Sequence, residues 1–564
     1  MKKRLFAVLL APLSLLGQLT MPDSPSFIEE MVLEPDYTVE IPAPESDDLL
    51  QLQFLAQKKQ RLMPMGKIIP IAVDFGKSKT IEVDEFTQSE SVEVHSAGAK
   101  GLTVYMSEVF LPIGSKLYVS NHIGTQIYGP FTLEDVKNER LVPSMIDGES
   151  IKITTVYNRS SSLKPRFNIS ELGYNFGDLT KPKNEFGSRD FGDSENCQVN
   201  ANCNEGANWR RQQKAVVRIK MRIQNFEGWC TGTIMNNTLQ DCTPYVVTAD
   251  HCREVEGQEA SLDNYNDWQF YFNYEGADCS NPRERDVAIG SQTGCKRVAY
   301  TQRQGSGGPD HLLVKLSDNI DGSIYDHHYA GWQNFDKASR SGVMIHHPAG
   351  DVKKISTYTT AIVNSAWEPS IKKDTHWEVY WASTENGKGV SEPGSSGSSL
   401  FNDSGLVIGV LTGGASACKE DTDKGVSPNF PDYFGKFSLA FGYKGSDKEH
   451  TLFEHLDGSN HTPILKGIDW PCSQLALNTE DLGQLYQNQI KVFPNPAQSV
   501  INLETEGIDI SSMKVLNSQG VTVFEPTESL TVNRINVENW ATGIYVIQLQ
   551  TSSNMIINKK FIVE

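Results

Sequence analysis

Short runs of alternating apolar and polar residues, separated by clusters of Gly, Asn, Asp and Ser, are the dominant pattern of this chain. Residues 101–106 (GLTVYM) and 116–120 (KLYVS) alternate with the period of two that is typical of β-strands. Between about residues 192 and 470, short strand-like runs follow one another and few segments have a helical period, which favours an all-β barrel or sandwich. The pattern therefore predicts a mostly β protein.

The length of 564 residues implies three or four domains. Changes in composition divide the chain into residues 1–19, a β-rich segment at 20–191, a strand-rich domain at 192–472, a polar linker at 473–489 and a compact end at 490–564. The segment 20–191 starts polar and Pro-rich. We interpret it as a propeptide, with a permanent N-terminal domain as the alternative.

The N-terminus has the pattern of a secretory signal peptide. The charged start MKKR precedes an apolar run at residues 5–16, and the chain turns polar at Gly17. As a helix this run would span only about 18 Å, well short of the roughly 30 Å of a hydrocarbon core. No later segment is apolar enough to cross a membrane, so we expect a mature form without a transmembrane segment.

Charge and cysteines narrow the class of protein. The net charge of −19 argues against nucleic acid as a partner, because phosphate binding needs a basic surface. All nine cysteines lie between Cys197 and Cys472. In an exported protein these cysteines are expected to form disulfides. They therefore mark one disulfide-bonded domain, with a segment that lacks cysteines on either side.

Two local patterns carry nucleophilic chemistry. The strand-like run at 245–249 leads into Thr-Ala-Asp-His-Cys (248–252), which presents His251 beside a cysteine. A Gly- and Ser-rich run, Gly-Val-Ser-Glu-Pro-Gly-Ser-Ser-Gly-Ser (389–398), precedes an apolar strand and allows the N–H groups of Gly394 and Ser396 to converge on an oxyanion. Alone, the histidine would more often be structural and the run a flexible loop. Together, and in this order, they favour catalysis.

A serine–histidine pair needs a third group to orient the imidazole. Asp310 lies at the start of the apolar run 311–316, which suits that role. The competing acids are Asp286, after a charged run, and Asp318 and Asp321, in an Asn/Gly turn. The order His, Asp, Ser is that of chymotrypsin-like proteases and excludes the Ser, Asp, His order of lipases and esterases.

The stretch from Cys197 to about Leu456 resembles lysyl endopeptidase, the lysine-specific bacterial branch of the trypsin-like serine proteases. Matching motifs include Cys-Thr-Gly-Thr (230–233), Thr-Ala-Asp-His-Cys (248–252), Ile-His-His-Pro (345–348) and the Gly/Ser run (389–398). The resemblance implies a double β-barrel trypsin-like protease domain. It assigns the general base, the orienting acid and the nucleophile to His251, Asp310 and Ser396.

The same resemblance implies disulfides Cys197–Cys418, Cys203–Cys279 and Cys230–Cys252. Cys242, Cys295 and Cys472 lie outside the family pattern. We predict that Cys242 pairs with Cys295 and that Cys472 is free or engaged elsewhere, although spacing alone does not decide connectivity.

Specificity follows from a second part of the resemblance. Trypsin-like enzymes usually carry their pocket acid six residues before the nucleophile, where this chain has Val390. The resemblance places the lysine-binding acid at Asp432 instead; the alternative is that Asp432 caps a surface turn. Trp367 matches an active-site tryptophan of the family, but the histidine that stacks on it there is Thr412 here. We therefore expect cleavage after Lys, with Arg possible and slower.

The segment 490–564 resembles the C-terminal sorting domain of Bacteroidetes type IX secretion substrates. It opens with Lys-Val-Phe-Pro-Asn-Pro-Ala (491–497) and later reads Ala-Thr-Gly-Ile-Tyr-Val (541–546). The resemblance implies a small C-terminal β-sandwich, engagement with the type IX secretion machinery, and a secreted or cell-surface location reached through the periplasm.

Other patterns carry less. The two adjacent histidines in each of the pairs His327-His328 and His346-His347 cannot bind the same metal ion, because neighbouring residues on a strand face opposite sides. We therefore expect no metal and no cofactor. The run 450–455 resembles an inverted zinc-protease motif with one residue too many and is expected to be a helix. The rival to a secreted serine endopeptidase is a non-catalytic surface adhesin on a protease fold, and a complete triad argues against it.

Overall fold

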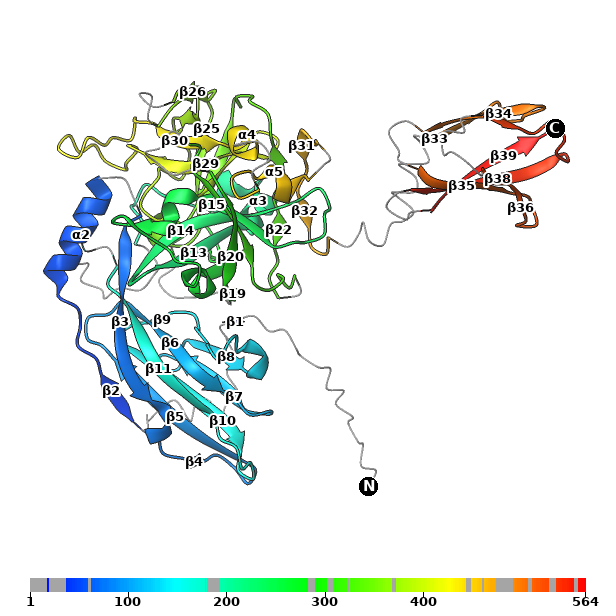
Figure 1. The fold of residues 1–564 in the computed structure, drawn as a ribbon. Coiled ribbons are helices and arrows are strands. Elements are labelled where there is room, and N and C mark those ends of the chain that lie inside the picture. Colours follow the sequence, from blue (N-terminus) through cyan, green and yellow to red (C-terminus); the bar gives the residue numbers. More distant parts are fainter. Residues whose placement is uncertain are drawn as a thin grey trace, which may run out of the picture. The chain divides into compact units, whose positions relative to one another are not determined.

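Strands dominate the protein (Figure 1). The computed structural model describes residues 18–19, 37–58, 62–177, 179, 193–281, 290–301, 308–322, 324–367, 372–442, 448–458, 461–472, 490–505, 510–526, 534–551 and 556–564. The mostly β class is confirmed. Most of the expected signal peptide, the expected processing region near residue 191 and the linker 473–489 lie outside the described residues. The chain divides into two compact units, Met1–Trp470 and Pro471–Glu564.

The N-terminal part of the first unit is a sandwich of two sheet layers. One layer has the strand order β2-β5-β10-β7-β8 with β4 beside β5, and the other contains β3, β11, β6 and β9. The strands are β2 (Thr38–Glu40), β3 (Pro64–Asp74), β4 (Ile81–Glu82), β5 (Thr87–His95), β6 (Gly101–Phe110), β7 (Lys116–Ser120), β8 (Ile127–Phe131), β9 (Ile146–Asp147), β10 (Ser150–Asn158) and β11 (Arg166–Asn175), and helix α2 is Ser46–Lys58. The strands predicted at 101–106 and 116–120 are β6 and β7.

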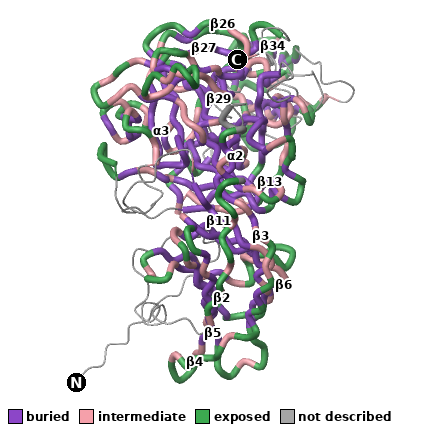
Figure 2. The backbone as a smooth tube through the Cα atoms, turned by 90° about the vertical axis from the view of Figure 1, so that its left-hand side faces the viewer, coloured by how far each residue is buried: buried purple, intermediate pink, exposed green. Residues whose placement is uncertain are grey.

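Alternation places the core of this sandwich between its layers. In the β5–β10 pairing, Val92 lies opposite Ile153 and Val94 opposite Ile151, and all four are fully buried. Cross-strand pairs of β-branched residues on one face stabilise such a sheet. In Figure 2, most residues along β11, β13 and β29 are buried, whereas those of β4 are exposed.

The rest of the first unit, residues 193–470, begins with a sheet in the order β19-β18-β13-β14, continued by the pairings of β15 with β14, β21 with β15 and β20 with β21. Its elements are β12 (Val199–Asn200), α3 (Arg210–Ala215), β13 (Val216–Ile223), β14 (Phe226–Met235), β15 (Tyr245–Ala249), β16 (Glu254–Val255), β17 (Gln258–Glu259), β18 (Gln269–Phe272), β19 (Gly290–Thr293), β20 (Cys295–Tyr300) and β21 (His311–Leu316). Gln18–Leu19 (β1) pairs with β19.

A second sheet has the order β12-β25-β24-β28-β29-β30-β27-β26, with β23 beside β29 and β31. The elements of this region are β22 (His328–Tyr329), β23 (Trp332–Gln333), β24 (Gly342–His346), β25 (Lys354–Tyr358), β26 (Val363–Ser365), β27 (His376–Val379), β28 (Ser399–Asn402), β29 (Val407–Gly414), β30 (Asp432–Lys436), α4 (Phe437–Phe441), α5 (Phe453–Leu456), β31 (Ile464–Leu465) and β32 (Ile468–Asp469). Strands β22 and β32 pair with each other in a separate sheet. Helix α5 covers only the end of the helix expected at 450–455.

The N-terminal sandwich and residues 193–470 share one sheet and one apolar cluster. Strand β3 pairs with the first residues of β14, so a single sheet passes from one part into the other. The side chains of Met63, Met65 and Met145 pack with those of Trp229 and Tyr271 in a common buried cluster. Separating the two parts would expose this apolar surface to water.

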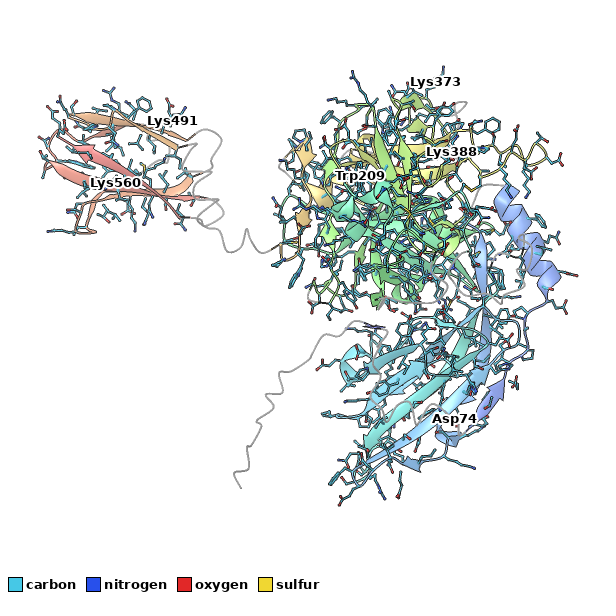
Figure 3. All side chains as sticks on the ribbon, turned by 180° about the vertical axis from the view of Figure 1, so that it is seen from behind. Asp74, Trp209, Lys373, Lys388, Lys491 and Lys560 are labelled. Atoms are coloured by element: carbon cyan, nitrogen blue, oxygen red, sulfur yellow. A yellow bond between two sulfur atoms is a disulfide. The ribbon has the colours of Figure 1, made fainter. Side chains whose placement is uncertain are left out.

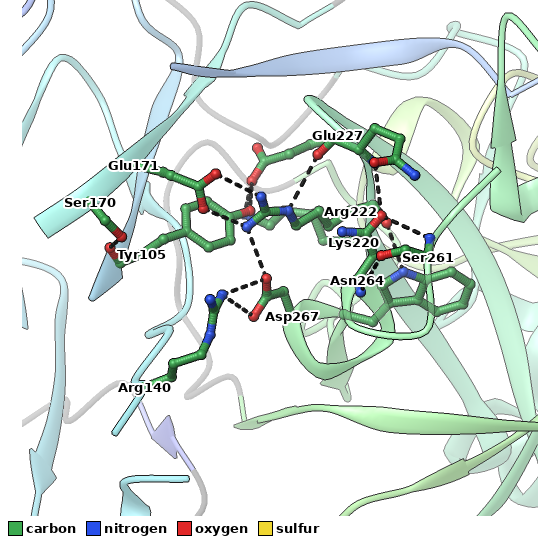
Figure 4. A network of polar contacts seen from close by, with 12 residues as sticks. Tyr105, Arg140, Ser170, Glu171, Lys220, Arg222, Glu227, Ser261, Asn264 and Asp267 are labelled. Carbon is green, nitrogen blue, oxygen red and sulfur yellow. Dashed lines mark hydrogen bonds and ion pairs between the residues drawn. The ribbon is translucent and has the colours of Figure 1, made fainter. Parts of the chain in front are cut away.

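Buried charges join the same two parts (Figure 4). Glu227 of β14 accepts hydrogen bonds from Tyr105 of β6 (2.6 Å) and from Lys220 of β13 (2.9 Å). Arg222 of β13 makes a two-pronged contact with Glu171 of β11 (2.7 and 2.8 Å). Burial lowers the pKa of Lys220 despite its pairing with Glu227. A charge taken out of water is expensive unless it is paired, so these contacts depend on both parts being in place.

The second unit is the predicted C-terminal β-sandwich. One sheet contains β33, β34 and β37 and the other β36, β35, β38 and β39, around a core that includes Ile501, Val515 and Ile547. The strands are β33 (Ile490–Phe493), β34 (Val500–Thr505), β35 (Ile510–Leu516), β36 (Thr522–Phe524), β37 (Arg534–Asn536), β38 (Gly543–Thr551) and β39 (Ile556–Val563). Lys491 on β33 and Lys560 on β39 mark its two sheets in Figure 3.

Replacing Glu227 with Ala is expected to lower the free energy of unfolding by about 3–5 kcal/mol, because it leaves the buried ammonium of Lys220 unpaired. Urea unfolding of the full chain, followed by tryptophan fluorescence, measures this. The matched control is Glu82→Ala, which removes the same charge from an exposed pair with Arg159 and is expected to cost about 0–1 kcal/mol. Equal losses in the two variants would contradict the assignment of a buried pair.

Candidate active site

The pairing of β15 with β21 brings His251 and Asp310 together. The two strands are antiparallel and in register at Ala249 and His311, so the residues just beyond that pair must meet. His251 lies in the short 3-10 turn after β15, and Asp310 immediately precedes β21. Asp310 adopts the left-handed backbone region (φ 58°), which aspartate tolerates better than most residues.

Two hydrogen bonds join this pair. The backbone N–H of His251 donates to one carboxylate oxygen of Asp310 (2.9 Å), and Nδ1 of the ring lies 2.7 Å from the other. Burial by itself lowers the pKa of His251, but the charge and hydrogen bond of Asp310, with Asp250 and Glu254 nearby, outweigh burial and raise it. Burial raises the pKa of Asp310, and His251 together with a hydrogen bond from Thr412 brings it below its ordinary value.

Of the competing acids, Asp318 has an exposed side chain that forms an ion pair with Lys137 (3.4 Å). Asp321 lies in a turn, where its backbone carbonyl accepts a hydrogen bond from the N–H of Tyr325. Asp286 lies outside the described residues. The ring atom Nε2 of His251 is buried and has no hydrogen-bond partner among the described residues. It is therefore available to a further group.

Ser396 lies in the loop before β28, and Thr231 of β14 holds this loop. The Thr231 hydroxyl donates to the carbonyl oxygen of Gly394 (2.9 Å), and its N–H donates to the carbonyl oxygen of Ser396 (2.8 Å). Thr248, which lies three residues before His251, donates a hydrogen bond from its hydroxyl to the Thr231 carbonyl (2.8 Å). A Cβ on Gly397 would lie 2.1 Å from the Thr248 hydroxyl oxygen, so only glycine permits this close approach. These contacts bring the Ser396 loop against the strand that ends at His251.

The loop is held from its other side by His346. Nδ1 of His346 lies 2.7 Å from the Ser395 hydroxyl oxygen, and the Ser398 hydroxyl donates to the Ser395 carbonyl. Burial, with the charge of Lys354 nearby, lowers the pKa of His346 to about 3, so this contact is between neutral groups. In the described part of the chain, neither the N–H of Gly394 nor that of Ser396 donates to a protein acceptor. Both can bind an oxygen anion.

Asp432 begins β30 and is fully buried, which contradicts the surface-turn alternative. Its carboxylate accepts from Nε1 of Trp381 (2.6 Å) and from the hydroxyl of Ser416 (2.6 Å). Burial raises the pKa of Asp432, and hydrogen bonds from Ser416, Trp381 and Ser391 partly offset it. Since the Ser391 N–H also donates to the Ser416 hydroxyl (3.1 Å), the same cluster ties Asp432 to the loop that carries Ser396.

Trp367 and Thr412 both contact His376 of β27. The N–H of Trp367 donates to Nδ1 of His376 (3.4 Å), and the hydroxyl oxygen of Thr412, which is buried on β29, lies 3.1 Å from Nε2. Trp367 packs edge-on against Tyr433, and a Cβ on Gly413 would meet its ring at 3.0 Å. Val390 is buried in the apolar core of the second sheet, as a residue without charge should be.

The disulfides Cys197–Cys418, Cys203–Cys279 and Cys230–Cys252 are present. The pairing of Cys242 with Cys295 is wrong, because Cys295 is free and buried, whereas Cys242 and Cys472 are both disulfide-bonded. Cys295 contacts the carbonyl of Tyr265 across the first sheet. Sequence spacing could not distinguish these possibilities, since they depend on how the strands fold back.

The paired histidines face different partners. His327 contacts the carbonyl of Tyr325 (2.6 Å) and His328 the carboxylate of Asp469 (2.6 Å). His346 contacts Ser395, and His347 contacts the carbonyl of Asp351 (3.0 Å). Neighbours in each pair thus point apart, as strand geometry requires.

Sequence reasoning missed several residues of this site. Thr231, Ser416 and Trp381 hold the loop and the buried acid, yet each is an ordinary residue in its local pattern. Only Thr231 carried a signal, as part of the Cys-Thr-Gly-Thr motif. The side-chain partners of Asp432 lie 51 residues (Trp381) and 16 residues (Ser416) before it in the sequence.

Comparison with known families decides what this site resembles. Residues 191–435 match the family model of the lysyl endopeptidase C-terminal domain. This part of the chain is therefore similar to the C-terminal domain of lysyl endopeptidase. Residues 491–564 match the family model of the secretion system C-terminal sorting domain. The sorting domain marks the protein for export, to a secreted or cell-surface location, and no described helix is long and apolar enough to cross a membrane.

Individual relatives are more distant. Lysyl endopeptidase from Pseudomonas aeruginosa is 28% identical over 311 residues, or 52% of this chain and 60% of that protein. Endo-acting ulvan lyase from Formosa agariphila is 22% identical over 257 residues, or 41% of this chain and 48% of that protein. The chain thus spans about half to three-fifths of the length of these relatives. The solved structure of protease Anisep from Arthrobacter nicotinovorans is 17% identical, covers 40% of this chain and 90% of its own, and has a TM-score of 0.27.

Replacing Thr231 with Val is expected to lower the free energy of unfolding by about 1–3 kcal/mol per buried group left unpaired, since the Gly394 carbonyl and the His347 N–H both lose their partner. Thermal or urea unfolding measures the loss. Thr233→Val, two residues further along β14, is the matched control. The Thr233 hydroxyl is buried without a partner among the described residues, so its removal is expected to be neutral or stabilising. An unchanged stability in Thr231→Val would contradict the role of the Thr231 hydroxyl in holding the Ser396 loop.

Proposed function

We propose that this protein is a secreted serine endopeptidase that hydrolyses peptide bonds after lysine through His251, Asp310 and Ser396. The observation that carries the proposal is the buried His251–Asp310 pair, whose free Nε2 lies at the strand end against which the Ser396 loop is clamped. A hydrogen bond from Ser396 to Nε2 is not required before substrate binds, because catalytic contacts often tighten only in the complex with substrate.

The chemistry follows from these positions. Nε2 of His251 takes the proton of the Ser396 hydroxyl as its oxygen attacks the substrate carbonyl, and the N–H groups of Gly394 and Ser396 bind the oxyanion that forms. His251 then gives the proton to the leaving amine. Asp310 stays ionised, holds Nδ1–H toward itself and stabilises the imidazolium. Water repeats the sequence on the acyl-enzyme and frees Ser396.

The raised pKa of His251 sets the direction of the pH dependence. The general base must be neutral, so activity increases as pH climbs through the pKa of His251. Because this pKa lies above its ordinary value, the acid limb of kcat/KM is expected above about pH 6.5. The lowered pKa of Asp310 keeps its carboxylate ionised throughout that range.

Asp432 supports the choice of lysine. A buried carboxylate with three polar donors around it still lacks a cation, and a substrate ammonium supplies one. Arginine is expected to be cut more slowly. Trp367 forms a wall beside Gly413, and Thr412 replaces the histidine that stacks on this tryptophan in the resembling family.

Two further elements of the proposal concern the proteolytic activation and the export of the protein. We expect residues up to about 191 to be removed on activation, and the sorting domain to engage the type IX secretion machinery. The shared sheet and buried charges mean that cleavage of the chain by itself leaves the N-terminal sandwich attached by the β3–β14 pairing.

Ser396→Ala and His251→Ala are each expected to lower kcat by roughly a million-fold, and Asp310→Asn by about ten-thousand-fold, because the three residues act as a unit. Cleavage of a lysyl peptide substrate measures the rates, and a fluorophosphonate probe should label the wild type and not Ser396→Ala. Absence of labelling in the processed wild type would favour the non-catalytic adhesin. If Asp310→Asn were fully active, Asp286 would become the candidate acid.

Asp432→Asn is expected to lower kcat/KM for lysyl substrates by the equivalent of about 2–5 kcal/mol in transition-state free energy, since the substrate ammonium would enter the pocket unpaired. Profiling a peptide library measures this and should show the lysine preference lost while slow cleavage persists. Asp403→Asn, at an exposed position before the turn into β29, serves as the control for loss of one carboxylate. Efficient cleavage after Phe, Leu or Glu by the wild type, or an unchanged preference in Asp432→Asn, would refute the assignment.

A further inference from the structure

Trp229 of β14 has neighbours both in the N-terminal sandwich and in the rest of the first unit. Its ring is 4% exposed and belongs to the buried cluster that includes Met63, Met65 and Met145 of the sandwich. A Cβ on Gly350 would lie 2.9 Å from two atoms of the same ring, so the indole rests directly on that glycine. Any side chain at position 350 would have to displace the indole.

The turn at residues 347–350 links this glycine to the loop before β28. The N–H of Ala349 donates to the carbonyl oxygen of Pro393 (2.6 Å). A Cβ on Gly394 would lie 2.8 Å from the backbone nitrogen of Gly350, so the turn and the loop touch through their backbones. The N–H of Gly394 is one of the two groups that bind the oxyanion in the proposed mechanism. A shift of the turn would therefore move one of those groups.

Two successive residues of this turn have left-handed backbone angles. Ala349 has a φ of 56° and Gly350 a φ of 72°. Such a conformation is unfavourable for alanine, so the turn keeps it only where its surroundings impose it. Arg218 of β13 contributes, because its Nη1 donates to the Gly350 carbonyl (2.8 Å) and its guanidinium carbon lies 4.2 Å from the centre of the Trp229 ring. The shape of the turn therefore depends on where the indole lies.

Strand β14 meets the sandwich at its start and the catalytic elements at its end. It pairs with β3 at residues 226–228 and with β15, the strand that leads to His251, at residues 233–235. None of the contacts described above between the sandwich and the rest of the first unit reaches His251, Ser396 or Asp432. These contacts therefore support the site and leave the catalytic side chains free for substrate.

We propose that Trp229 is a positioning residue for the N–H of Gly394, which acts through the turn at 347–350, and that the N-terminal sandwich is a permanent subunit of the active enzyme because it holds the Trp229 ring. The inference rests on the proposed function. It goes beyond the expected cut near residue 191, because that cut breaks the chain and leaves these contacts in place. Loss of the sandwich would take the methionine neighbours from the indole and expose apolar surface to water.

The first test compares Met65→Ala and Met145→Ala with the matched control Met106→Ala in the full chain. Met106 is also buried but belongs to the sandwich's own core. Hydrogen exchange of residues 347–351 and 393–398, followed by mass spectrometry, reports on the turn and the loop without turnover. The first two variants are expected to speed this exchange by about two- to thirtyfold, the effect of coupling through packed contacts. Met106→Ala is expected to leave it unchanged, and Met65→Leu, which nearly conserves volume, is expected to restore slow exchange.

Kinetics give a second readout of the same variants. In Met65→Ala and Met145→Ala, kcat for a lysyl peptide is expected to fall by a similar factor while KM stays the same, because the N–H of Gly394 acts in the transition state and the pocket of Asp432 is untouched. Exchange that stays unchanged, exchange that speeds up equally in Met106→Ala, or a loss carried by KM alone would overturn the role of Trp229.

The second test measures the composition of the processed, secreted protein by native mass spectrometry. The fragment that contains residues 37–179 is expected to stay bound to the fragment that contains Ser396. Glu171→Gln, which weakens the two-pronged contact with Arg222, is expected to increase the released fraction, and Glu82→Gln, in an exposed ion pair, is expected to leave it unchanged.

A fully active processed enzyme without residues 37–179 would overturn the permanent subunit. Binding and hydrogen exchange are both measured without turnover, so failure of the proposed function can be recognised separately. If the wild type cut no peptide and bound no fluorophosphonate while the fragments stayed together and exchange changed as expected, the proposed function alone would be refuted.

Discussion

The buried carboxylate of Asp310 is the constraint around which the site is built. A lone ion at that depth would be neutralised or would unfold its surroundings, so each of its oxygens needs a donor. The structure supplies the backbone N–H and the ring of His251, and Thr412 on β29 helps to lower the pKa of Asp310. These groups come from both sheets of residues 193–470. Satisfying one charge therefore requires that the two sheets be packed in a single arrangement.

Thr231 and its neighbours provide the mechanical link between those sheets. Thr231 bonds to the loop of Ser396 and receives Thr248 from the next strand. The adjacent Cys230 is joined by a disulfide to Cys252, the residue after His251. Covalent and hydrogen-bonded ties thus converge on the two residues whose separation matters most, and a small displacement there can cost catalysis heavily.

The N-terminal sandwich uses the same physical rule for a different purpose. Tyr105 and Lys220 both donate to Glu227, Lys220 also donates to the Thr103 hydroxyl, and Gly66 and Gly173 leave the space that the Glu227 carboxylate fills. Buried ion pairs add little net stability over apolar packing, but they strongly penalise a wrong arrangement. The sheet that crosses from β3 to β14 therefore joins the sandwich to residues 193–470 in one register.

The sequence by itself determined the mostly β class and the strands at 101–106 and 116–120, which local alternation encodes. The three family-type disulfides and the pairing of His251 with Asp310 join residues far apart in the chain, and the resemblance to a known family was needed to expect the disulfides. Tertiary structure alone decided that Cys295 stays free and that Asp432 is buried among Trp381 and Ser416. It also brought His376 to Thr412, because contacts between strands distant in sequence depend on register and packing, which no local pattern records.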